Sequence, residues 1–195
     1  NQGNYDKAIE NFIASLKIKE EAGDKKGTAS SYSNIGAIYF QQGNFDKALE
    51  NHTAALKIRE EFSDKKGIAE SHNNIGLIYL EQNFFDKALF GFLKALSMQE
   101  EIGNKAGIAN AYNNIGNVYN RRAENYKGKS PEKIKSQYEK ALENYLTALK
   151  IREETGDKSS VASCYNNIAA IYTKQKKFSE AEQMLNKSLN INKEI

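Results

Sequence analysis

The chain repeats itself with a period of 40 residues, and this internal repeat restricts the possible fold more than any other feature. One short segment occurs as Asn4–Ile9, Asn44–Leu49 and Phe84–Leu89. Another occurs as Ser33–Gly36, Asn73–Gly76, Asn113–Gly116 and, after a longer interval, Asn166–Ala169. The longer interval places one insertion at about residues 122–135. A repeat of this length predicts a solenoid, in which each unit packs against its neighbours in sequence.

Each period contains two stretches with helical spacing of apolar and small residues. The first stretch is shown by Ala29, Tyr32, Ile35, Gly36 and Tyr39, and the second runs from Phe45 to Ile58. Gly43 and Asn44 separate the two, as a left-handed glycine followed by a helix-capping amide. We therefore predict an all-α fold, an α-α superhelix of stacked antiparallel helix pairs.

The predicted organisation is a single array over residues 1–195. An unpaired second helix at 1–23 precedes helix pairs at 24–63, 64–103, 104–156 and 157–195, and the third pair carries the insertion. Within the insertion, we expect a loop at 123–130 and a helix that begins at Pro131 with Ser130 as its cap. Both ends cut a repeat, so we expect a fragment of a longer protein or, alternatively, a homodimer formed through exposed terminal helices.

Small residues recur at one position of each first helix, at Gly36, Gly76, Gly116 and Ala169. Glycine inside a helix costs about 0.5–1 kcal/mol relative to alanine. We therefore predict that the two helices of each pair approach closely at this position.

These residues resemble the tetratricopeptide repeat. The residues that match its consensus are Tyr32, Ile35, Gly36, Tyr39, Ala48, His52 and Ala55. The resemblance implies stacked helix pairs and a role in binding other proteins. Glu20, Glu60, Glu100 and Glu153 stand where the consensus has a helix-ending proline, so the second helices should be longer than usual. This 40-residue variant is similar to the repeats of rapsyn, of Leu-Gly-Asn-type adaptors and of bacterial signalling proteins.

Asparagines line the predicted inner face of the first helices. An amide side chain both donates and accepts hydrogen bonds, so a row of amides can hold the backbone of an extended peptide. The candidate peptide-binding residues are Asn34, Asn73, Asn74, Asn110, Asn113, Asn114, Asn117, Asn166 and Asn167. The alternative interpretation is that Asn34, Asn74, Asn114 and Asn167 tie adjacent first helices together, and one amide can do both.

The insertion holds the excess positive charge of the chain. Residues 121–135 contain six basic and two acidic residues, in a chain whose formal net charge is +3. The simplest interpretation is a solvated linker. The alternative is a docking site for an acidic partner at Arg121, Arg122, Lys127 and Lys129, and nucleic acid is the least favoured ligand.

The sequence offers little for catalysis. Its only histidines, His52 and His72, fall on core positions, and a metal site needs three or four ligands. Cys164, the single cysteine, fits a reducing compartment and a small buried side chain. The sequence has neither a membrane span nor a secretion signal, and we expect a cytoplasmic location.

The predicted function is thus that of a non-catalytic scaffold, without cofactor or metal, that binds a peptide or a helical segment of a protein partner in the asparagine-lined groove. The alternative is a regulatory or sensor module of a larger signalling protein.

Overall fold

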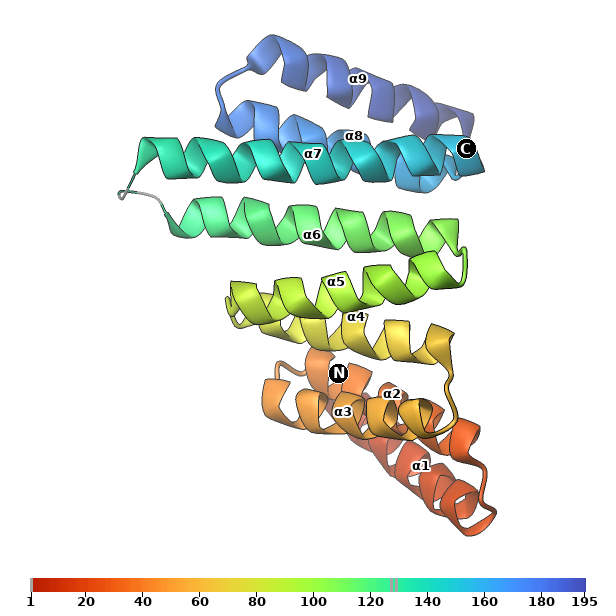
Figure 1. The fold of residues 1–195 in the computed structure, drawn as a ribbon. Coiled ribbons are helices and arrows are strands. Elements are labelled where there is room, and N and C mark those ends of the chain that lie inside the picture. The colour runs from red at the N-terminus through yellow and green to blue at the C-terminus, as the bar shows by residue number, and fades with distance from the viewer. Residues whose placement is uncertain (1, 127, 129) are drawn as a thin grey trace. The chain divides into compact units, whose positions relative to one another are not determined.

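The computed structural model describes residues 2–126, 128 and 130–195, and all regular secondary structure in these residues is helical. The helices are α1 (Gln2–Glu21), α2 (Lys25–Gln41), α3 (Phe45–Glu61), α4 (Lys65–Glu81), α5 (Phe85–Glu101), α6 (Lys105–Asn125), α7 (Pro131–Thr155), α8 (Lys158–Lys174) and α9 (Phe178–Glu194) (Figure 1). The prediction of an all-α fold is confirmed.

The chain forms two compact units, at residues 1–98 and 99–195. In the first unit, α1 packs on α2, α2 on α3 and α3 on α4. In the second unit, α6 packs on α7, α7 on α8 and α8 on α9. Each unit is thus built from helices that contact their neighbours in sequence, as expected for stacked hairpins.

The helices begin where the sequence places capping residues. Asp24, Asp64, Asn104 and Asp157 cap α2, α4, α6 and α8, and the side chain of each accepts a hydrogen bond from a backbone N–H three residues on. The residue before each cap has a positive φ, and at Ser63 this residue is not a glycine. A positive φ at these positions ends one helix and allows the chain to reverse.

The small residues of the first helices receive a ring from the second helix of the same pair. A Cβ atom added at Gly36 would lie 2.9 Å from the ring of His52. The same atom would lie 2.8 Å from the Phe92 ring at Gly76 and 2.6 Å from the Tyr145 ring at Gly116. The predicted close approach is therefore confirmed at these glycines.

The second helices continue through the glutamates that replace the consensus proline. Glu20, Glu60, Glu100 and Glu153 all lie inside helices. These helices end one or two residues beyond the glutamates, so the extension past this position is less than the full turn that the missing proline predicts.

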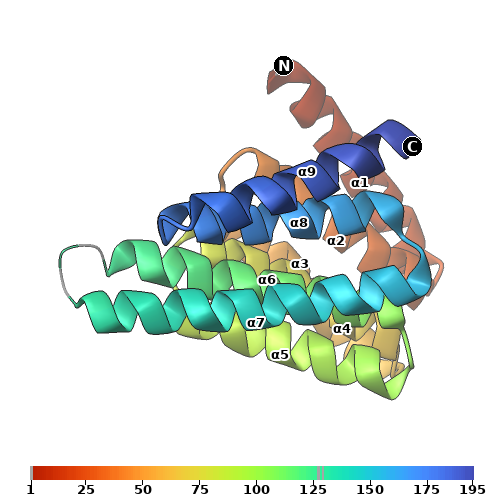
Figure 2. The same cartoon turned by 90° about the horizontal axis from the view of Figure 1, so that it is seen from above.

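The insertion lengthens two helices more than it lengthens a loop. Ser130 and Pro131 begin α7 as predicted, with the Ser130 hydroxyl accepting from the Lys133 N–H at 3.4 Å. The prediction of a loop from residue 123 is wrong, because α6 continues to Asn125. Ala123 is fully buried in a core cluster that includes Tyr138, and this burial keeps the added turns helical. The first turns of α7 extend past α8 and α9 (Figures 1 and 2).

Candidate functional site

Amide side chains from α6 and α8 meet in the second unit. The Asn167 Nδ2 donates to the Asn113 Oδ1 at 2.9 Å. Lys174 makes a second contact between α8 and α6. Its Nζ donates to the Asn120 Oδ1 at 3.0 Å and also pairs with Glu124. These bonds join two first helices, as the alternative interpretation predicts for Asn167.

Two further asparagines of α6 bond to α7. The Tyr145 hydroxyl donates to the Asn117 Oδ1 at 2.7 Å, and the Arg152 Nη2 donates to the Asn110 Oδ1 at 2.8 Å. Both bonds occupy the amide oxygen. The amide N–H groups are therefore the part of these side chains that a ligand would use.

Asn166 is the exposed member of the α8 pair, and Asn114 on α6 is half-buried. We call the surface formed by Asn110, Asn113, Asn114, Asn117, Asn166 and Asn167 the amide face. Six of the nine predicted residues thus lie on α6 and α8, where the Asn113–Asn167 bond joins the two helices, and their binding role stays a prediction.

The other three predicted residues belong to the first unit. Asn34 on α2 is exposed, whereas Asn73 and Asn74 on α4 are half-buried. The Asn73 Nδ2 lies 3.5 Å from the Asn74 Oδ1. Ser33, at the position that corresponds to Asn113, has a buried hydroxyl without a hydrogen-bond partner among the described residues. Among the described hydrogen bonds, the one that joins asparagines of two first helices, from Asn167 to Asn113, lies in the second unit.

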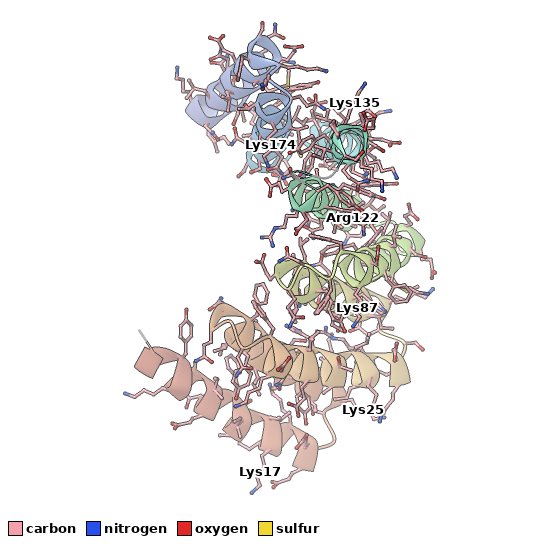
Figure 3. All side chains as sticks on the ribbon, turned by 90° about the vertical axis from the view of Figure 1, so that its left-hand side faces the viewer. Lys17, Lys25, Lys87, Arg122, Lys135 and Lys174 are labelled. Carbon is pink, nitrogen blue, oxygen red and sulfur yellow. The ribbon has the colours of Figure 1, made fainter. Side chains whose placement is uncertain are left out.

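The predicted acidic-partner site is only partly described. Arg121 and Arg122 are half-buried on the last turns of α6, and the Arg122 guanidinium lies 6.0 Å from the centre of the Tyr119 ring. Figure 3 labels Arg122. Lys127 and Lys129 lie outside the described residues. The docking role of these four residues stays a prediction.

Both histidines and the cysteine take packing positions. His52 is 2% exposed, and burial together with Arg59 lowers its pKa to about 4. His72 is half-buried, and burial lowers its pKa. Burial raises the pKa of the Cys164 thiol. The described residues contain no group of three His, Cys, Asp or Glu side chains able to hold a metal ion.

A buried polar contact recurs between the helices and was not predicted from the sequence. The Arg59 Nη1 donates to the Ser71 Oγ at 2.8 Å and to the Gly67 carbonyl oxygen at 3.0 Å. Twelve residues also separate Lys19 from Ser31 and Arg152 from Cys164, which are joined in the same way at 3.0 Å. The available signal was a polar residue at a fixed place before each Glu-Glu pair. These side chains link each second helix to the next first helix.

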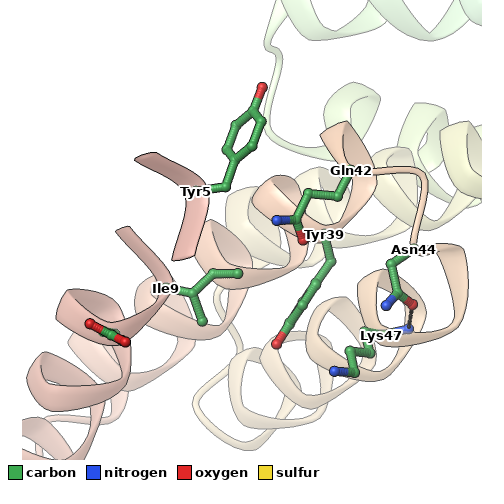
Figure 4. Close-up of a pocket in the computed structure, with 7 residues that line it drawn as sticks. Tyr5, Ile9, Tyr39, Gln42, Asn44 and Lys47 are labelled. Carbon is green, nitrogen blue, oxygen red and sulfur yellow. Dashed lines mark hydrogen bonds between the residues drawn. The ribbon is translucent and has the colours of Figure 1, made fainter. Parts of the chain in front are cut away.

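A cleft in the first unit was not predicted either. It has a volume of about 760 Å³ and lies between α1 and the hairpin of α2 and α3 (Figure 4). Tyr5 and Ile9 line it from α1, opposite Tyr39. The Lys47 Nζ lies 5.0 Å from the centre of the Tyr39 ring, and it closes the cleft on the side of α3.

No helix in the described part of the chain is long and apolar enough to cross a bilayer.

Comparisons with known proteins agree with the geometry. The tetratricopeptide repeat matches residues 1–61 and 133–194, and a second form of the same repeat matches residues 69–102. A search of curated proteins found no match.

Several solved structures are similar. BtubC (BKLC) from P. vanneervenii has a TM-score of 0.79 at 24% identity, over 98% of this chain and 74% of that one. The apo form of RapI has a TM-score of 0.79 at 19% identity, over 100% of this chain and 50% of that one. The sensor-containing signal transduction ATPase PH0952 from Pyrococcus horikoshii has a TM-score of 0.74 at 19% identity, over 95% of this chain and 28% of that one.

The chain thus spans half of RapI and less than a third of the ATPase, and at these identities the likeness shows the fold alone. Because the repeat itself matches more than half of the sequence, this chain belongs to the tetratricopeptide repeat family, whose fold serves as a scaffold for protein interactions.

Proposed function

We propose that the chain is a non-catalytic scaffold and that its amide face binds an extended or helical segment of a partner protein. The observation that carries the proposal is the hydrogen bond between asparagines of α6 and α8. Asn113 and Asn167 hold each other at 2.9 Å, which fixes their orientation before a ligand arrives. Pre-organised polar groups lose less conformational entropy when they bind.

The chemistry of the face favours recognition of a peptide backbone. The bonds that Asn110 and Asn117 accept hold their amide oxygens in place, and their amide N–H groups are the donors that a ligand would use. Asn166 on α8 is exposed. Backbone carbonyl oxygens accept from such donors whatever the peptide sequence, and side chains beside them would set specificity. A Rap protein of similar fold is known in complex with competence and sporulation factor, at 19% identity and a TM-score of 0.77.

The test is peptide selection followed by measurement of affinity. Peptides are selected from a random display library on the 195-residue chain, and their dissociation constants are measured by fluorescence anisotropy. Replacing Asn114 and Asn166 together by Ala should weaken these peptides by about tenfold or more, equivalent to about 1.4 kcal/mol. Asn190→Ala removes an exposed amide of α9 and is the matched control.

Versions of the same peptides with backbone amides replaced by esters should also bind more weakly, because an ester carbonyl oxygen is a weaker hydrogen-bond acceptor than an amide carbonyl oxygen. Unchanged affinity for both the double variant and the ester peptides would reject the amide face as the site.

A regulatory or sensor role is the second candidate. The ATPase of similar fold is described with a tetratricopeptide repeat sensor, and it is much longer than the segment that matches this chain. In this role, the amide face would report peptide binding to an output domain. An output domain encoded in the same reading frame as these 195 residues would favour the sensor over the simple scaffold.

A further inference from the structure

The insertion creates a pocket that the repeat pattern does not contain. Helix α7 has 25 residues, compared with 17 in α3 and α5, and its first turns extend past the α8–α9 turn (Figure 2). A pocket of about 480 Å³ lies between α7 and the segment Lys174–Lys177.

The floor of the pocket is apolar. Ile134, Tyr138 and Leu142 follow one another at helical spacing along α7 and all line the pocket. Tyr138 is buried in the core, whereas Ile134 and Leu142 are half-buried and pack on its edge. The exposed surface of Ile134 and Leu142 can contact a large apolar side chain of a ligand.

The rim of the pocket is basic. Lys135, Lys174 and Lys177 line it, and among the described lining residues Glu139 supplies the one carboxylate. Figure 3 labels Lys135 on α7 and Lys174 at the end of α8. Lys174 pairs with Glu124, and the Lys135 Nζ lies 3.9 Å from the Glu139 Oε1, where both side chains are exposed. Since exposed pairs of this kind are weak, Lys135 can exchange Glu139 for a ligand carboxylate. Lys177 is exposed, with its Nζ 5.8 Å from the centre of the Tyr172 ring, and can reach the same ligand.

Two polar features of the pocket also favour the binding of a ligand. The Gln175 Oε1 is buried and accepts no hydrogen bond within the described structure, and a buried carbonyl oxygen of this kind is costly until a donor reaches it. Lys177 stands at the N-cap of α9 and supplies no capping bond there among the described residues. The first turn of α9 contains one acidic residue, Glu180, and its N–H groups also favour a negative group of a ligand nearby.

We propose that this pocket binds a short acidic segment of a partner protein. One leucine or aromatic side chain of the segment sits on Ile134 and Leu142, and its backbone donates to Gln175. Neighbouring Asp or Glu side chains pair with Lys135 and Lys177. The charge balance selects an acidic over a basic peptide, and the apolar floor distinguishes this ligand from a simple polyanion.

The experiment selects twelve-residue random peptides on the 195-residue chain, with depletion on the Ile134→Asp variant. Peptides that depend on the pocket should contain a leucine or aromatic residue flanked by Asp or Glu. Melting curves recorded by circular dichroism first establish that Ile134→Asp is folded. If it is not, Ile134→Ala replaces it.

Affinities of the selected peptides then test each part of the pocket. Lys135→Glu with Lys177→Glu should weaken binding by about tenfold or more, and Lys150→Glu, an exposed lysine elsewhere on α7, should leave it unchanged. Loss of affinity should also follow from replacement of the peptide's Asp and Glu by Asn and Gln.

The proposal is overturned if no peptide depends on Ile134, or if the dependent peptides are neutral or basic. A nucleic acid or anionic vesicle that competes with the peptide, while the apolar anchor is dispensable, would also overturn it. Among the described residues, the six asparagines of the amide face do not line the pocket, whereas Lys174 lines it and also donates to Asn120 on α6. Peptides that respond to Asn114→Ala with Asn166→Ala, but not to the lysine variants, would contradict the pocket and leave the amide face intact.

Discussion

Substituting alanine for Gly116 tests the packing that defines each helix pair. The added Cβ would lie 2.6 Å from the Tyr145 Cε1 and 2.7 Å from its Cδ1, where ordinary contacts begin at 3.4 Å. The Tyr145 ring is 1% exposed and has little space into which to move. Its hydroxyl also bonds to Asn117 at 2.7 Å, so a displaced ring would stretch that bond.

The expected change in the free energy of unfolding is the sum of opposing contributions. Alanine gains about 0.5–1 kcal/mol of helix propensity over glycine. Overpacking costs about 1–3 kcal/mol, and weakening the hydrogen bond costs up to about 1 kcal/mol more. Gly116→Ala should therefore lower the free energy of unfolding by about 1–3 kcal/mol, although the same change stabilises an exposed helix.

The fourth helix pair suggests the compensating change. Ala169 occupies the position of Gly116, and Leu185 the position of Tyr145. Tyr145→Leu should destabilise the chain alone, but the double variant should be more stable than the sum of the two single changes by about 1 kcal/mol or more.

Urea denaturation followed by circular dichroism gives these free energies. Hydrogen exchange of the α6 and α7 amides is the second readout, because repeat arrays need not unfold in one step. Additivity of the two substitutions within about 0.5 kcal/mol, or a stabilising Gly116→Ala, would refute the reasoning.

Three further changes have expected outcomes. Arg59→Ala removes donors to Gly67 and Ser71 inside the core and should cost about 2–4 kcal/mol in urea denaturation, and a change under 0.5 kcal/mol would contradict this. His52 is neutral in the folded chain because its pKa falls from 6.5 to about 4, so its contribution is complete above pH 6.5 and is lost as pH falls toward 4, by up to about 3 kcal/mol. His52→Phe should flatten this part of the pH profile, and an unchanged profile would assign the acid sensitivity to other groups. Asn167→Ala should cost about 1 kcal/mol in urea denaturation through its bond to Asn113, and no measurable loss would show that the bond contributes nothing.

The repeat predicted the helices and their order because each helix carries its own periodicity and caps. Gly43 and Asn44, for example, are sufficient to place a turn, and the structure has a positive φ and a capping bond there. The glycine positions also predicted close packing. Glycine inside a helix lowers the stability of that helix, so a glycine that recurs at one position indicates a close contact there. The caps, turns and glycine positions are local or recur with the period, so they can be recognised in a single sequence.

The details of the polar contacts could not be predicted in the same way. Asn113 and Asn117 lie one turn apart on α6, yet one bonds to α8 and the other to the Tyr145 hydroxyl on α7. Small rotations of a helix decide between such partners, and sequence spacing does not resolve them. The pocket also depends on how the first turns of α7 lie against Lys174–Lys177, which sequence spacing does not specify.

The most direct test of the peptide-binding role is a titration of the isotope-labelled chain with a peptide selected on it, monitored through the asparagine side-chain amide signals in two-dimensional NMR spectra. The account predicts shifts at Asn114 and Asn166 and along the rest of the amide face, with Asn186 and Asn190 of α9 unchanged. Shifts restricted to α9, or an amide face that stays unchanged while the peptide binds, would contradict it.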